Sequence, residues 1–340
     1  MEIIARPAFS NRDQNPYNFL LYSSLKSQGV VVHEKLGFSS LLKSKVIHVH
    51  WPESFLNQEK MISVLLRALL LFGVVFSAKV FGLKLVWTVH NLKPHERRHP
   101  KLNAWFYEKF PKLCHGLIFL SDFTKNKAMV EIPSMKSVKS RVVLHGHYRD
   151  VFPEPKSRSF AKKELGINPA TKVVLFFGMI RRYKNVPLLI ERFNELNESG
   201  AMLIVAGSVV NDNSLEREIL ELSKGKENIV LDLNRISEEK LHLLISASDC
   251  IVLPYADVAN SGSILLALSL NRMVLAPNKG SLSEIRSYVG NDYLHLYEGD
   301  FTRESLEDGL SNGGREREVD MSAFDWGVLA KQTHDFYLEL

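Results

Sequence analysis

Short apolar runs alternate with longer segments of helical periodicity along the whole chain. Several of the short runs are nearly continuous in Val, Ile and Leu, which is typical of parallel strands buried on both faces. Strands are predicted at residues 46–49, 85–89, 117–120, 142–144, 173–177, 203–206, 229–231, 250–253 and 273–276. Helices are predicted between them, for example at residues 186–197, 214–223, 237–247 and 262–270, and at the C-terminal stretch 325–340. This alternation predicts an α/β fold with doubly wound sheets.

A polar segment with two prolines divides the pattern into two halves. Residues 152–159 read FPEPKSRS, a composition typical of a linker. We therefore expect one Rossmann-like domain at residues 1–154, a second at residues 160–322, and a C-terminal helix at 323–340 that returns to the first domain. Because ligands bind beyond the carboxyl ends of strands in open α/β sheets, we expect the two domains to face each other across a ligand-binding cleft.

The composition narrows the class of protein. Of 340 residues, 45% are apolar and 24% are charged, which excludes large-scale disorder and a fold built on disulfides. Cys114 and Cys250 have no metal-site spacing, and residues 1–6 lack the layout of a signal peptide, so we expect a cytoplasmic protein. The net charge of +5 permits a nucleotide, a phosphate or an anionic membrane surface as partner, without choosing among them.

One strongly apolar segment runs from residue 61 to residue 87. It is interrupted by Arg67, Lys79 and Lys84, which leaves only residues 68–78 free of charge. That stretch is shorter than the roughly 20 apolar residues that cross a bilayer. Two interpretations stay open: a buried helix, or a helix that lies in a membrane interface with its Arg and Lys at the lipid headgroups.

Polar motifs follow the predicted strands of the first half. The strand at 46–49 leads into His50-Trp51-Pro52-Glu53, where the proline ends the strand. Glu53 is then either a general base or a carboxylate that stabilises a helix N-terminus. The strand at 85–89 leads into residues 90–96, HNLKPHE, the densest group of polar side chains in the chain. A His followed by an Asn at a strand end can hydrogen-bond a sugar hydroxyl or a phosphate.

The last strand of the first half is followed by residues 145–150, HGHYRD. Gly146 permits either an unusual backbone angle or the close approach of a ligand. A role in packing at the hinge between the domains is the alternative.

Two further motifs in the second half indicate a site for phosphate groups. Residues 178–185, GMIRRYKN, join a glycine turn to Arg181 and Lys184, which suits a diphosphate, although the spacing is not that of a P-loop. Residues 254–263, PYADVANSGS, precede a helix that begins near Gly262. Free backbone N–H groups at such a helix start can hold an anion, while Asn260 or Ser261 can equally be a plain N-cap.

The residues of the second half resemble the nucleotide-sugar-binding domain of GT-B glycosyltransferases over about residues 170–300. The resemblance is carried by Phe177-Gly178 with the basic residues at 181 and 184, by LIVAG at 203–207, by SASDCIVLP at 246–254 and by VLAP at 274–277. Nearly the whole chain is also similar to the β-mannosyltransferase family of xanthan-type exopolysaccharide assembly. The motifs that carry this similarity, in order, are NPY at 15–17, HWPE at 50–53, HNL at 90–92 with PHE at 94–96, HGHYRD at 145–150, IR with YK at 180–184, NSG at 260–262 and LYEG at 296–299.

The resemblance implies two GT-B domains, an N-terminal one for the acceptor and a C-terminal one for the donor. It implies GDP-mannose as donor, a polyprenyl-diphosphate-linked glycan as acceptor and inversion to a β-mannoside. It also implies peripheral association with the inner membrane, whereas no nucleic acid partner is expected. Because the chain lacks an Asp-x-Asp motif, we expect neither a metal nor another cofactor.

Residue roles are expected as follows. The candidate bases are Glu53, Glu96 and Asp150. The candidates for donor-sugar and diphosphate contact are His90, Arg181, Lys184, Asn260, Ser261, Gly262 and Ser263. The residues expected at the acceptor or along the cleft are Tyr17, Trp51, His95, His147 and Tyr148, and those expected at the ribose are Asp257 and Glu284.

The chain departs from the large retaining branch of GT-B enzymes at one place. That branch carries a Glu-x7-Glu pair, but here no Glu occurs between Pro254 and Lys279. This departure argues against a retaining mechanism and favours a non-catalytic module. Three alternatives stay open: a retaining transferase that uses another nucleotide sugar, a non-catalytic module that binds sugar nucleotides or glycolipids, and a GT-B-like epimerase or phosphorylase.

Overall fold

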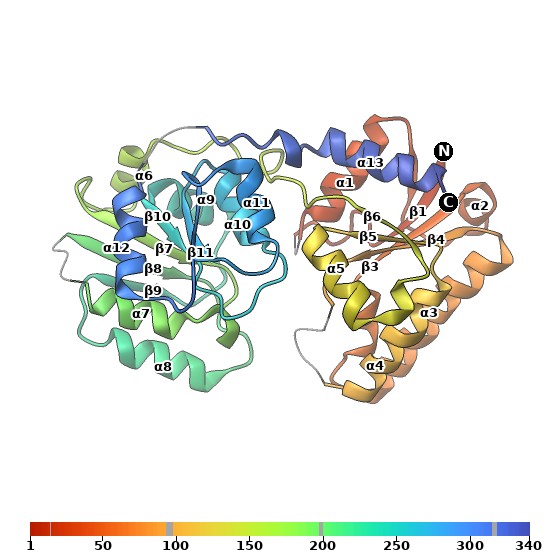
Figure 1. The fold of residues 1–340 in the computed structure, drawn as a ribbon, viewed down its shortest axis with the longest axis horizontal. Coiled ribbons are helices and arrows are strands. Elements are labelled where there is room, and N and C mark those ends of the chain that lie inside the picture. The colour runs from red at the N-terminus through yellow and green to blue at the C-terminus, as the bar shows by residue number, and fades with distance from the viewer. Residues whose placement is uncertain (14, 93–97, 197–199, 315–317) are drawn as a thin grey trace. The chain divides into compact units, whose positions relative to one another are not determined.

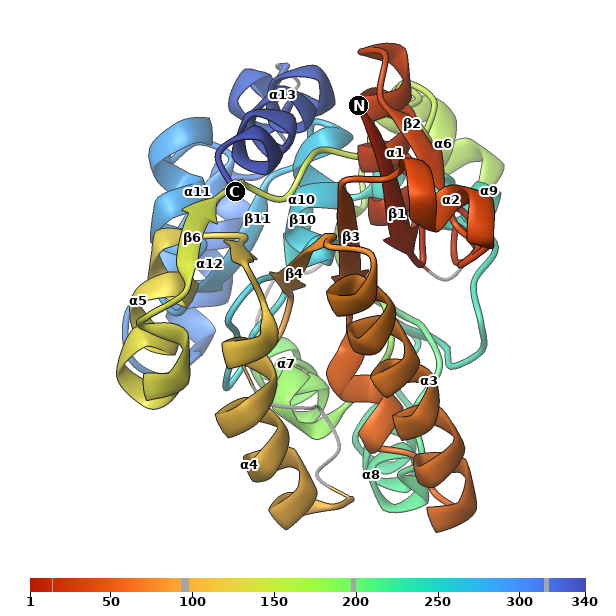
Figure 2. The same cartoon turned by 90° about the vertical axis from the view of Figure 1, so that its right-hand side faces the viewer.

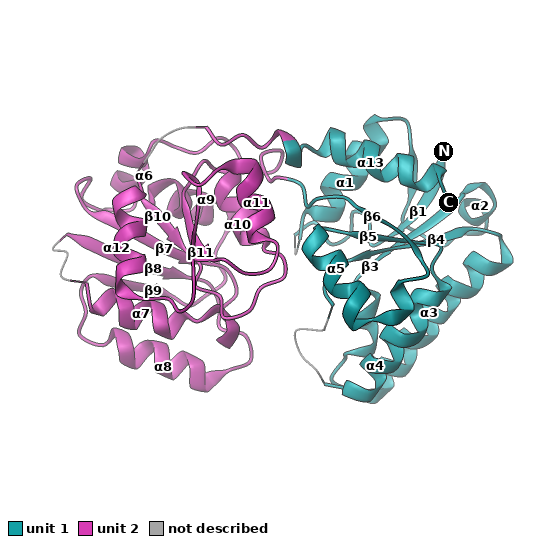
Figure 3. Ribbon diagram, viewed as in Figure 1, with its two compact units in different colours: residues 1–146, 323–340 teal, residues 147–322 magenta. Residues whose placement is uncertain are grey.

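The chain folds into two compact units (Figure 3). The computed structural model describes residues 1–13, 15–92, 98–196, 200–314 and 318–340. Unit 1 comprises residues 1–146 and 323–340, and unit 2 comprises residues 147–322. Each unit contains a six-stranded parallel sheet, so the predicted α/β fold with doubly wound sheets is confirmed. The segment predicted as a linker, residues 152–159, belongs to unit 2.

Unit 1 has the strand order β2-β1-β3-β4-β5-β6. Its strands are β1 (Glu2–Arg6), β2 (Val31–His33), β3 (Val46–His50), β4 (Lys84–Val89), β5 (Gly116–Phe119) and β6 (Lys139–Val142). Its helices are α1 (Tyr17–Ser27), α2 (Phe38–Lys43), α3 (Met61–Val80), α4 (Pro100–Lys109), α5 (Asp122–Glu131) and α13 (Trp326–Leu338), with a 3-10 turn η1 (Pro52–Leu56). The C-terminal helix α13 lies beside α1 (Figure 1).

The two faces of this sheet differ in chemistry because successive side chains of a strand point to opposite faces. Ile47 and Val49 of β3, together with Trp87 and Val89 of β4, join one apolar core with α3 and α4, which lie on the same side of the sheet (Figure 2). His48 and His50 of β3 point to the other face, where they meet side chains of α1 and α13. The apolar core stabilises the unit, and the opposite face carries its buried polar groups.

Unit 2 has the strand order β12-β11-β10-β7-β8-β9. Its strands are β7 (Lys172–Phe177), β8 (Ala201–Ala206), β9 (Ile229–Asp232), β10 (Cys250–Val252), β11 (Val274–Pro277) and β12 (Leu294–Tyr297). Its helices are α6 (Arg158–Glu164), α7 (Val186–Asn194), α8 (Asn213–Ser223), α9 (Glu238–Ala247), α10 (Gly262–Ser269), α11 (Leu282–Val289) and α12 (Arg303–Asn312), with a 3-10 turn η4 (Arg182–Lys184). The order reverses between β7 and β10, which makes their carboxyl ends the topological switch point of this sheet.

Among the strands, the differences from the prediction are at short or polar ones. β1, β2 and β12 are not among the predicted strands, and the strand predicted at residues 142–144 lies at Lys139–Val142 instead. β2, β6 and β12 are sheet edges, where one side of the strand is unpaired and polar side chains are tolerated. β1 is buried, but its apolar run of Ile3, Ile4 and Ala5 is too short to predict a strand from the sequence alone.

The apolar segment of unit 1 forms one long helix, α3, of 20 residues. A single stripe of Val64, Leu71, Val74 and Ala78 is buried against the core. The rest of the helix exposes large apolar side chains: Met61, Ile62, Leu65, Leu66, Leu69, Leu70, Phe72, Phe76 and Val80. Among the described residues, α3 is the one helix whose length and hydropathy would suffice to cross a membrane.

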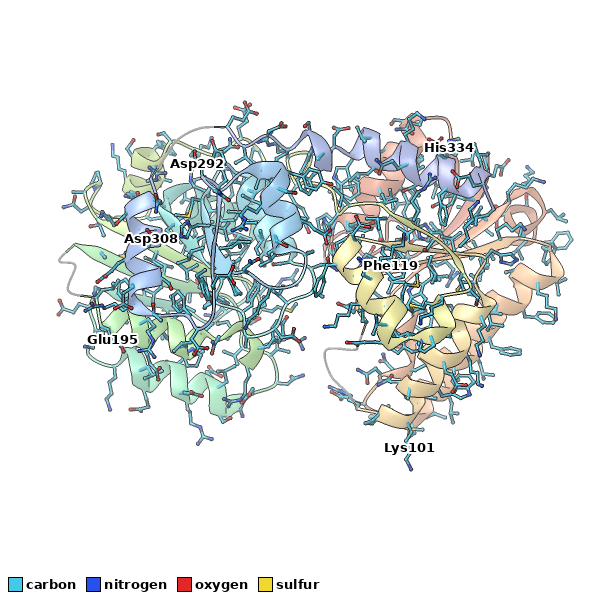
Figure 4. All side chains as sticks on the ribbon, in the orientation of Figure 1. Lys101, Phe119, Glu195, Asp292, Asp308 and His334 are labelled. Atoms are coloured by element: carbon cyan, nitrogen blue, oxygen red, sulfur yellow. The ribbon has the colours of Figure 1, made fainter. Side chains whose placement is uncertain are left out.

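Figure 4 labels one side chain of the core of unit 1 and one at its surface. Phe119 of β5 lies inside unit 1, while Lys101 at the start of α4 extends into solvent. Two features of unit 1 depart from this ordinary pattern: the exposed apolar face of α3, and the buried histidines His48 and His50 of β3 and His90 after β4.

Candidate active site

The first cluster of polar side chains lies at the carboxyl ends of β3 and β4. The strand order of unit 1 reverses between β1 and β3, so the end of β3 is a switch point where ligands bind in sheets of this kind. Trp51 is the residue directly after β3, and its backbone has a left-handed conformation with φ 49°, which is uncommon for a residue with a large side chain. Pro52 then begins η1, and this turn places Glu53 in the first turn of a 3-10 helix.

Glu53 is a buried carboxyl group, with 4% of its surface exposed. The side chain of Asn91 donates a hydrogen bond to it, but Oε2 has no hydrogen-bond partner among the described residues. Burial raises the pKa of Glu53 to about 7, an effect that the hydrogen bonds only partly offset. A carboxyl group with a pKa near the operating pH suits a general base.

His90 follows β4 and packs against Trp51. The two rings are stacked, with centroids 4.0 Å apart and an interplanar angle of 17°. Nε2 of His90 lies 2.9 Å from Nδ1 of His50. Burial, and then the neighbouring His145, hold the pKa of His90 well below its usual value, so the ring is neutral at pH 7.

A pocket of about 480 Å³ lies next to this cluster, where it is lined by Leu92 of the HNL motif and by residues of α4 that no sequence motif contains. It is bounded largely by apolar and aromatic groups, including Leu92 and Tyr107, and the Tyr107 hydroxyl donates to the carbonyl oxygen of Asn91. Asn103 lines the same pocket, and neither polar atom of its buried amide has a partner among the described residues. The only sequence signal for Asn103 is a polar residue on a helix face that is otherwise apolar.

The second cluster lies at the switch point of unit 2, where β7 ends. Gly178 has φ +100°, and a Cβ atom there would lie 3.3 Å from Oγ of Ser263 and 3.5 Å from Nζ of Lys184. The glycine therefore allows the end of β7, the start of α10 and the lysine ammonium group to converge. Lys184 is 8% exposed, and its Nζ lies 5.6 Å from the centre of the Tyr255 ring.

The start of α10 completes this second cluster. Oγ of Ser261 accepts a hydrogen bond of 3.4 Å from the backbone N–H of Ile264, so Ser261 is the N-cap that the sequence left open. The first N–H groups of a helix have no partner within it, so those of Gly262 and Ser263 add a partial positive charge near Lys184. Burial, and then the charge of Arg181, lower the pKa of Lys184 to about 8, which leaves the ammonium form dominant at pH 7. The arrangement is suited to an anion such as a phosphate group.

Comparison with known proteins gives these two clusters a chemical context. The sequence pattern of the family "Glycosyl transferases group 1" matches residues 157–287, the part of unit 2 that contains Gly178, Lys184 and α10. Over 334 residues the chain is 29% identical to the GDP-mannose:glycolipid 4-beta-D-mannosyltransferase of Xanthomonas campestris pv. campestris, a match that covers 97% of this chain and 89% of that protein. This chain has the GT-B fold and contains a glycosyl transferases group 1 domain. The predicted resemblance to β-mannosyltransferases is thereby confirmed as a similarity that runs through both units.

Solved structures show the same fold. Sucrose-phosphate synthase from Thermosynechococcus elongatus superposes with a TM-score of 0.71 at 15% identity, covering 100% of this chain and 98% of that one. HepE from Anabaena, in complex with UDP and glucose, has a TM-score of 0.66 at 13% identity and covers 100% of both chains. At these identities the comparison establishes the fold of the glycosyltransferase and nothing finer.

The predicted site residues of the glycosyltransferase fall into two groups. Unit 1 brings Glu53, His90 and Trp51 together, with the Tyr17 ring 5.0 Å from His90 and 1% exposed. His95 and Glu96 lie outside the described residues.

Unit 2 brings together the predicted phosphate residues around Lys184 and α10, with the Tyr148 hydroxyl 2.9 Å from where a Cβ atom of Gly262 would lie. Asp150 and Asp257 are exposed in unit 2, Glu284 is half-buried on α11, and His147 is buried with its Nδ1 accepting from the backbone N–H of Arg149. Glu53 is therefore the one buried carboxyl group among the candidate bases that the structure describes. Within the described ranges, no group of three His, Cys, Asp or Glu side chains is arranged to hold a metal ion.

The structure corrects one interpretation in unit 1. Gly146 has no unusual φ, and a Cβ atom there would lie 2.3 Å from the indole of Trp326. The close approach that the glycine permits is therefore made by the first residue of α13 and not by a ligand.

Proposed function

We propose that this glycosyltransferase moves mannose from GDP-mannose to a polyprenyl-diphosphate-linked oligosaccharide in exopolysaccharide assembly. The observation that carries the proposal is the 29% identity to the Xanthomonas enzyme, because it extends over 97% of the chain and spans both units. The similarity therefore includes both the unit expected to bind the donor and the unit expected to bind the acceptor. Similarity confined to the group 1 domain would support a nucleotide-sugar site alone.

The transfer proceeds as a single displacement with inversion. The acceptor hydroxyl oxygen forms a bond to C1 of mannose while the bond from C1 to the diphosphate oxygen breaks, and GDP leaves with the electron pair. Glu53 takes the proton of the acceptor hydroxyl. Its burial, its unpartnered Oε2 and its raised pKa support this role, because such a carboxylate gains stability by accepting a proton.

The leaving diphosphate is stabilised by Lys184 and by the start of α10 without a divalent metal. Gly178 supports this assignment because it lets the lysine Nζ and Ser263 approach the same point. The negative charge that develops on the leaving group meets a fixed cation and fixed N–H dipoles, which need no reorganisation during the reaction. His90 contacts the mannose hydroxyls from the carboxyl end of β4.

The acceptor lipid stays in the cytoplasmic leaflet of the inner membrane, and α3 holds the enzyme there. Its exposed face carries many large apolar side chains, while its charged residues are Arg67 and Lys79, with no Asp or Glu. An apolar face with basic residues matches an anionic membrane surface. The buried stripe of α3 belongs to the core of unit 1, so the helix lies along the membrane surface and does not cross it.

The decisive experiment is a transfer assay with the purified chain, a polyprenyl-diphosphate-linked oligosaccharide and GDP-mannose, UDP-glucose or dTDP-glucose. We expect mannosyl product from GDP-mannose only, with a β anomeric configuration by NMR. An α product would overturn inversion and favour the retaining alternative. GDP-mannose binding without any product, for the wild type and for Glu53→Gln alike, would contradict the enzyme assignment.

A further inference from the structure

A row of buried polar rings crosses unit 1 from the C-terminal helix to His90. Its members are Tyr337 of α13, His48 of β3, Tyr22 of α1, His50 of β3 and His90 after β4, and we call it the imidazole row. The Tyr337 hydroxyl lies 2.6 Å from Nδ1 of His48, and the Tyr22 hydroxyl lies 2.9 Å from the same atom. The Tyr22 hydroxyl is also 2.5 Å from Nε2 of His50, whose Nδ1 lies 2.9 Å from Nε2 of His90.

Every ring of the row is uncharged. His48 is fully buried, and burial lowers its pKa to about 3. Burial also holds the pKa of His50 well below its usual value, and it raises the pKa of the Tyr22 and Tyr337 hydroxyls. Each imidazole therefore has one N–H donor and one lone pair, and each phenol keeps its proton.

This proton inventory assigns a direction to the row. A phenol hydroxyl is a stronger donor than an imidazole N–H, so Nδ1 of His48, which faces two phenols, carries the lone pair. Tyr337 is the closer of the two phenols by 0.3 Å, the difference between 2.6 and 2.9 Å, and donates to it. The Tyr337 oxygen also lies within hydrogen-bond reach of the Tyr22 hydroxyl, but an imidazole nitrogen is the stronger acceptor. With the lone pair of His48 taken, the Tyr22 hydroxyl therefore donates to Nε2 of His50, at 2.5 Å. The proton of His50 then lies on Nδ1 and is donated to Nε2 of His90, which places the His90 proton on Nδ1. His48 donates its own proton from Nε2 to Oγ1 of Thr88, at 2.7 Å.

The other neighbours of His90 do not determine which of its ring nitrogens carries the proton. Trp51 stacks on the ring face, and Tyr17 meets it edge-on, so both contacts are indifferent to which nitrogen carries the proton. His145, the remaining ionisable group that acts on His90, has its own Nδ1 2.8 Å from the carbonyl oxygen of Gly146. Nδ1 of His90 has no hydrogen-bond partner within the described ranges, in contrast to Nε2 with its contact to His50.

We propose that the imidazole row fixes His90 as the Nδ1–H tautomer and holds it as a hydrogen-bond donor to the donor sugar, with Tyr22 and Tyr337 as positioning residues. This inference rests on the proposed sugar contact of His90. A wrong tautomer would set a lone pair of the ring against an oxygen lone pair of the sugar, so the row decides whether the contact is attractive. It also links α13, the last helix of the chain, to the site at the end of β4.

The test uses two variants and a matched control. Tyr22→Phe removes the hydroxyl that bonds His50, and Tyr337→Phe frees the His48 lone pair, so that Tyr22 can turn towards it and the row can reverse. Thr333→Val removes another buried hydroxyl of α13, which bonds the carbonyl oxygen of Leu329 within the helix. It is the control because it does not touch the row.

The first readout is the tautomer of His90, measured from the ring nitrogen shifts of the full chain labelled with ¹⁵N-histidine and assigned by difference with His90→Gln. We expect a single Nδ1–H form in the wild type and in Thr333→Val, and a mixture of tautomers in Tyr22→Phe and Tyr337→Phe. A wild-type ring protonated on Nε2, or a single unchanged tautomer in both Tyr variants, would overturn the proposal.

The second readout is the mannosyl transfer rate. We expect kcat to fall about 10- to 100-fold in Tyr22→Phe while KM for the donor changes less than about 3-fold, because a misplaced contact costs more in the transition state than in binding. Mixed tautomers with an unchanged kcat would refute a role in transfer. If the wild type uses no GDP-mannose, the proposed function fails, whereas the tautomer result still decides the direction of the row.

Discussion

Single residues of this chain take on their chemistry from the elements around them. Glu53 follows Pro52 and Trp51, and the backbone of Trp51 is in the left-handed region. The turn that these residues form buries the carboxyl group of Glu53. Lys184 lies on an otherwise ordinary basic turn, but Gly178 gives its ammonium group room beside the start of α10. In both cases a neighbouring residue with special backbone geometry decides how a titratable side chain behaves.

The raised pKa of Glu53 predicts a pH-dependent stability. Because the carboxyl group keeps its proton up to about pH 7 in the folded chain but loses it near pH 4.5 when unfolded, its stabilising contribution is lost as pH rises through that window. As pH rises from 5 to 8, the wild type should lose about 2–3 kcal/mol in its free energy of unfolding relative to Glu53→Gln, which has no charge to bury. Urea unfolding at both pH values measures this difference, and equal pH profiles for the two proteins would contradict it.

Lys184 is expected to dominate the binding of the donor diphosphate. Lys184→Ala should weaken GDP-mannose binding about 10- to 100-fold by calorimetry, since a charge-assisted hydrogen bond in a buried site is lost. Arg182→Ala is the matched control, because Arg182 lies on the same turn but pairs with Asp212 and Glu218 at the surface. Equal losses in both variants would indicate a general electrostatic effect in place of a specific contact.

At the scale of elements, the helices α3 and α13 of unit 1 have roles beyond covering the sheet. α3 buries a narrow stripe and leaves a wide apolar face exposed, while α13 returns from the end of the chain to pack Trp326 over Gly146. Each of these roles depends on which face of the helix meets the core, and each can be tested with substitutions that leave the helix intact.

The exposed face of α3 should determine membrane binding. Leu69 and Phe72 are 67% and 70% exposed, so Leu69→Asp combined with Phe72→Asp should abolish co-sedimentation with vesicles that contain anionic lipid, with little change in folding. Val130→Asp is the control, because Val130 of α5 is 78% exposed but lies outside this face. Loss of binding in the control, or retention in the double variant, would remove α3 as the membrane contact. Added salt should weaken binding, since Arg67 and Lys79 contribute electrostatically.

The docking of α13 should depend on the absence of a side chain at position 146. Gly146→Ala puts a methyl group 2.3 Å from the Trp326 indole, so we expect a loss of about 1–3 kcal/mol in the free energy of unfolding. Gly73→Ala has open space around it within α3 and should raise stability by about 0.5–1 kcal/mol. Urea denaturation distinguishes the two, and a neutral Gly146→Ala would show that α13 shifts without cost.

At the scale of the whole molecule, two parallel sheets each present a polar cluster at a switch point. Unit 1 carries the buried carboxyl group and the imidazole row, and unit 2 carries the cationic cluster around Lys184. The similarity to the Xanthomonas enzyme reaches across both units, while the group 1 pattern is confined to residues 157–287.

Donor selection is a property of the whole chain that thermal unfolding can measure. A ligand at 100 times its Kd adds about 2.7 kcal/mol to the stability of the folded state, which corresponds to a rise of a few degrees in Tm. We expect this rise with GDP-mannose, in the presence or absence of EDTA, and not with UDP- or dTDP-sugars. A shift that needs a divalent cation would contradict the proposed metal independence, and a larger shift with another nucleotide would identify a different donor.

The sequence by itself determined the fold class, the positions of most buried strands and the identity of the residues that follow them. These features are encoded locally, because a run of Val, Ile and Leu and the glycine or proline after it lie within one short window. The motifs at residues 50–53 and 178–184 are therefore visible in the sequence alone, and they contain Glu53 and Lys184, the two residues on which the proposed chemistry depends.

Only the tertiary structure decided which of those residues meet. His48, Tyr22 and Tyr337 come from three separate elements, and their row forms because β3 lies beside β4 under α1 and α13. Likewise the contact between Gly146 and Trp326 could not be predicted, since the two residues are far apart in the chain. Strand order and helix docking depend on the packing of the complete core, and a local pattern of hydrophobic positions carries no information about it.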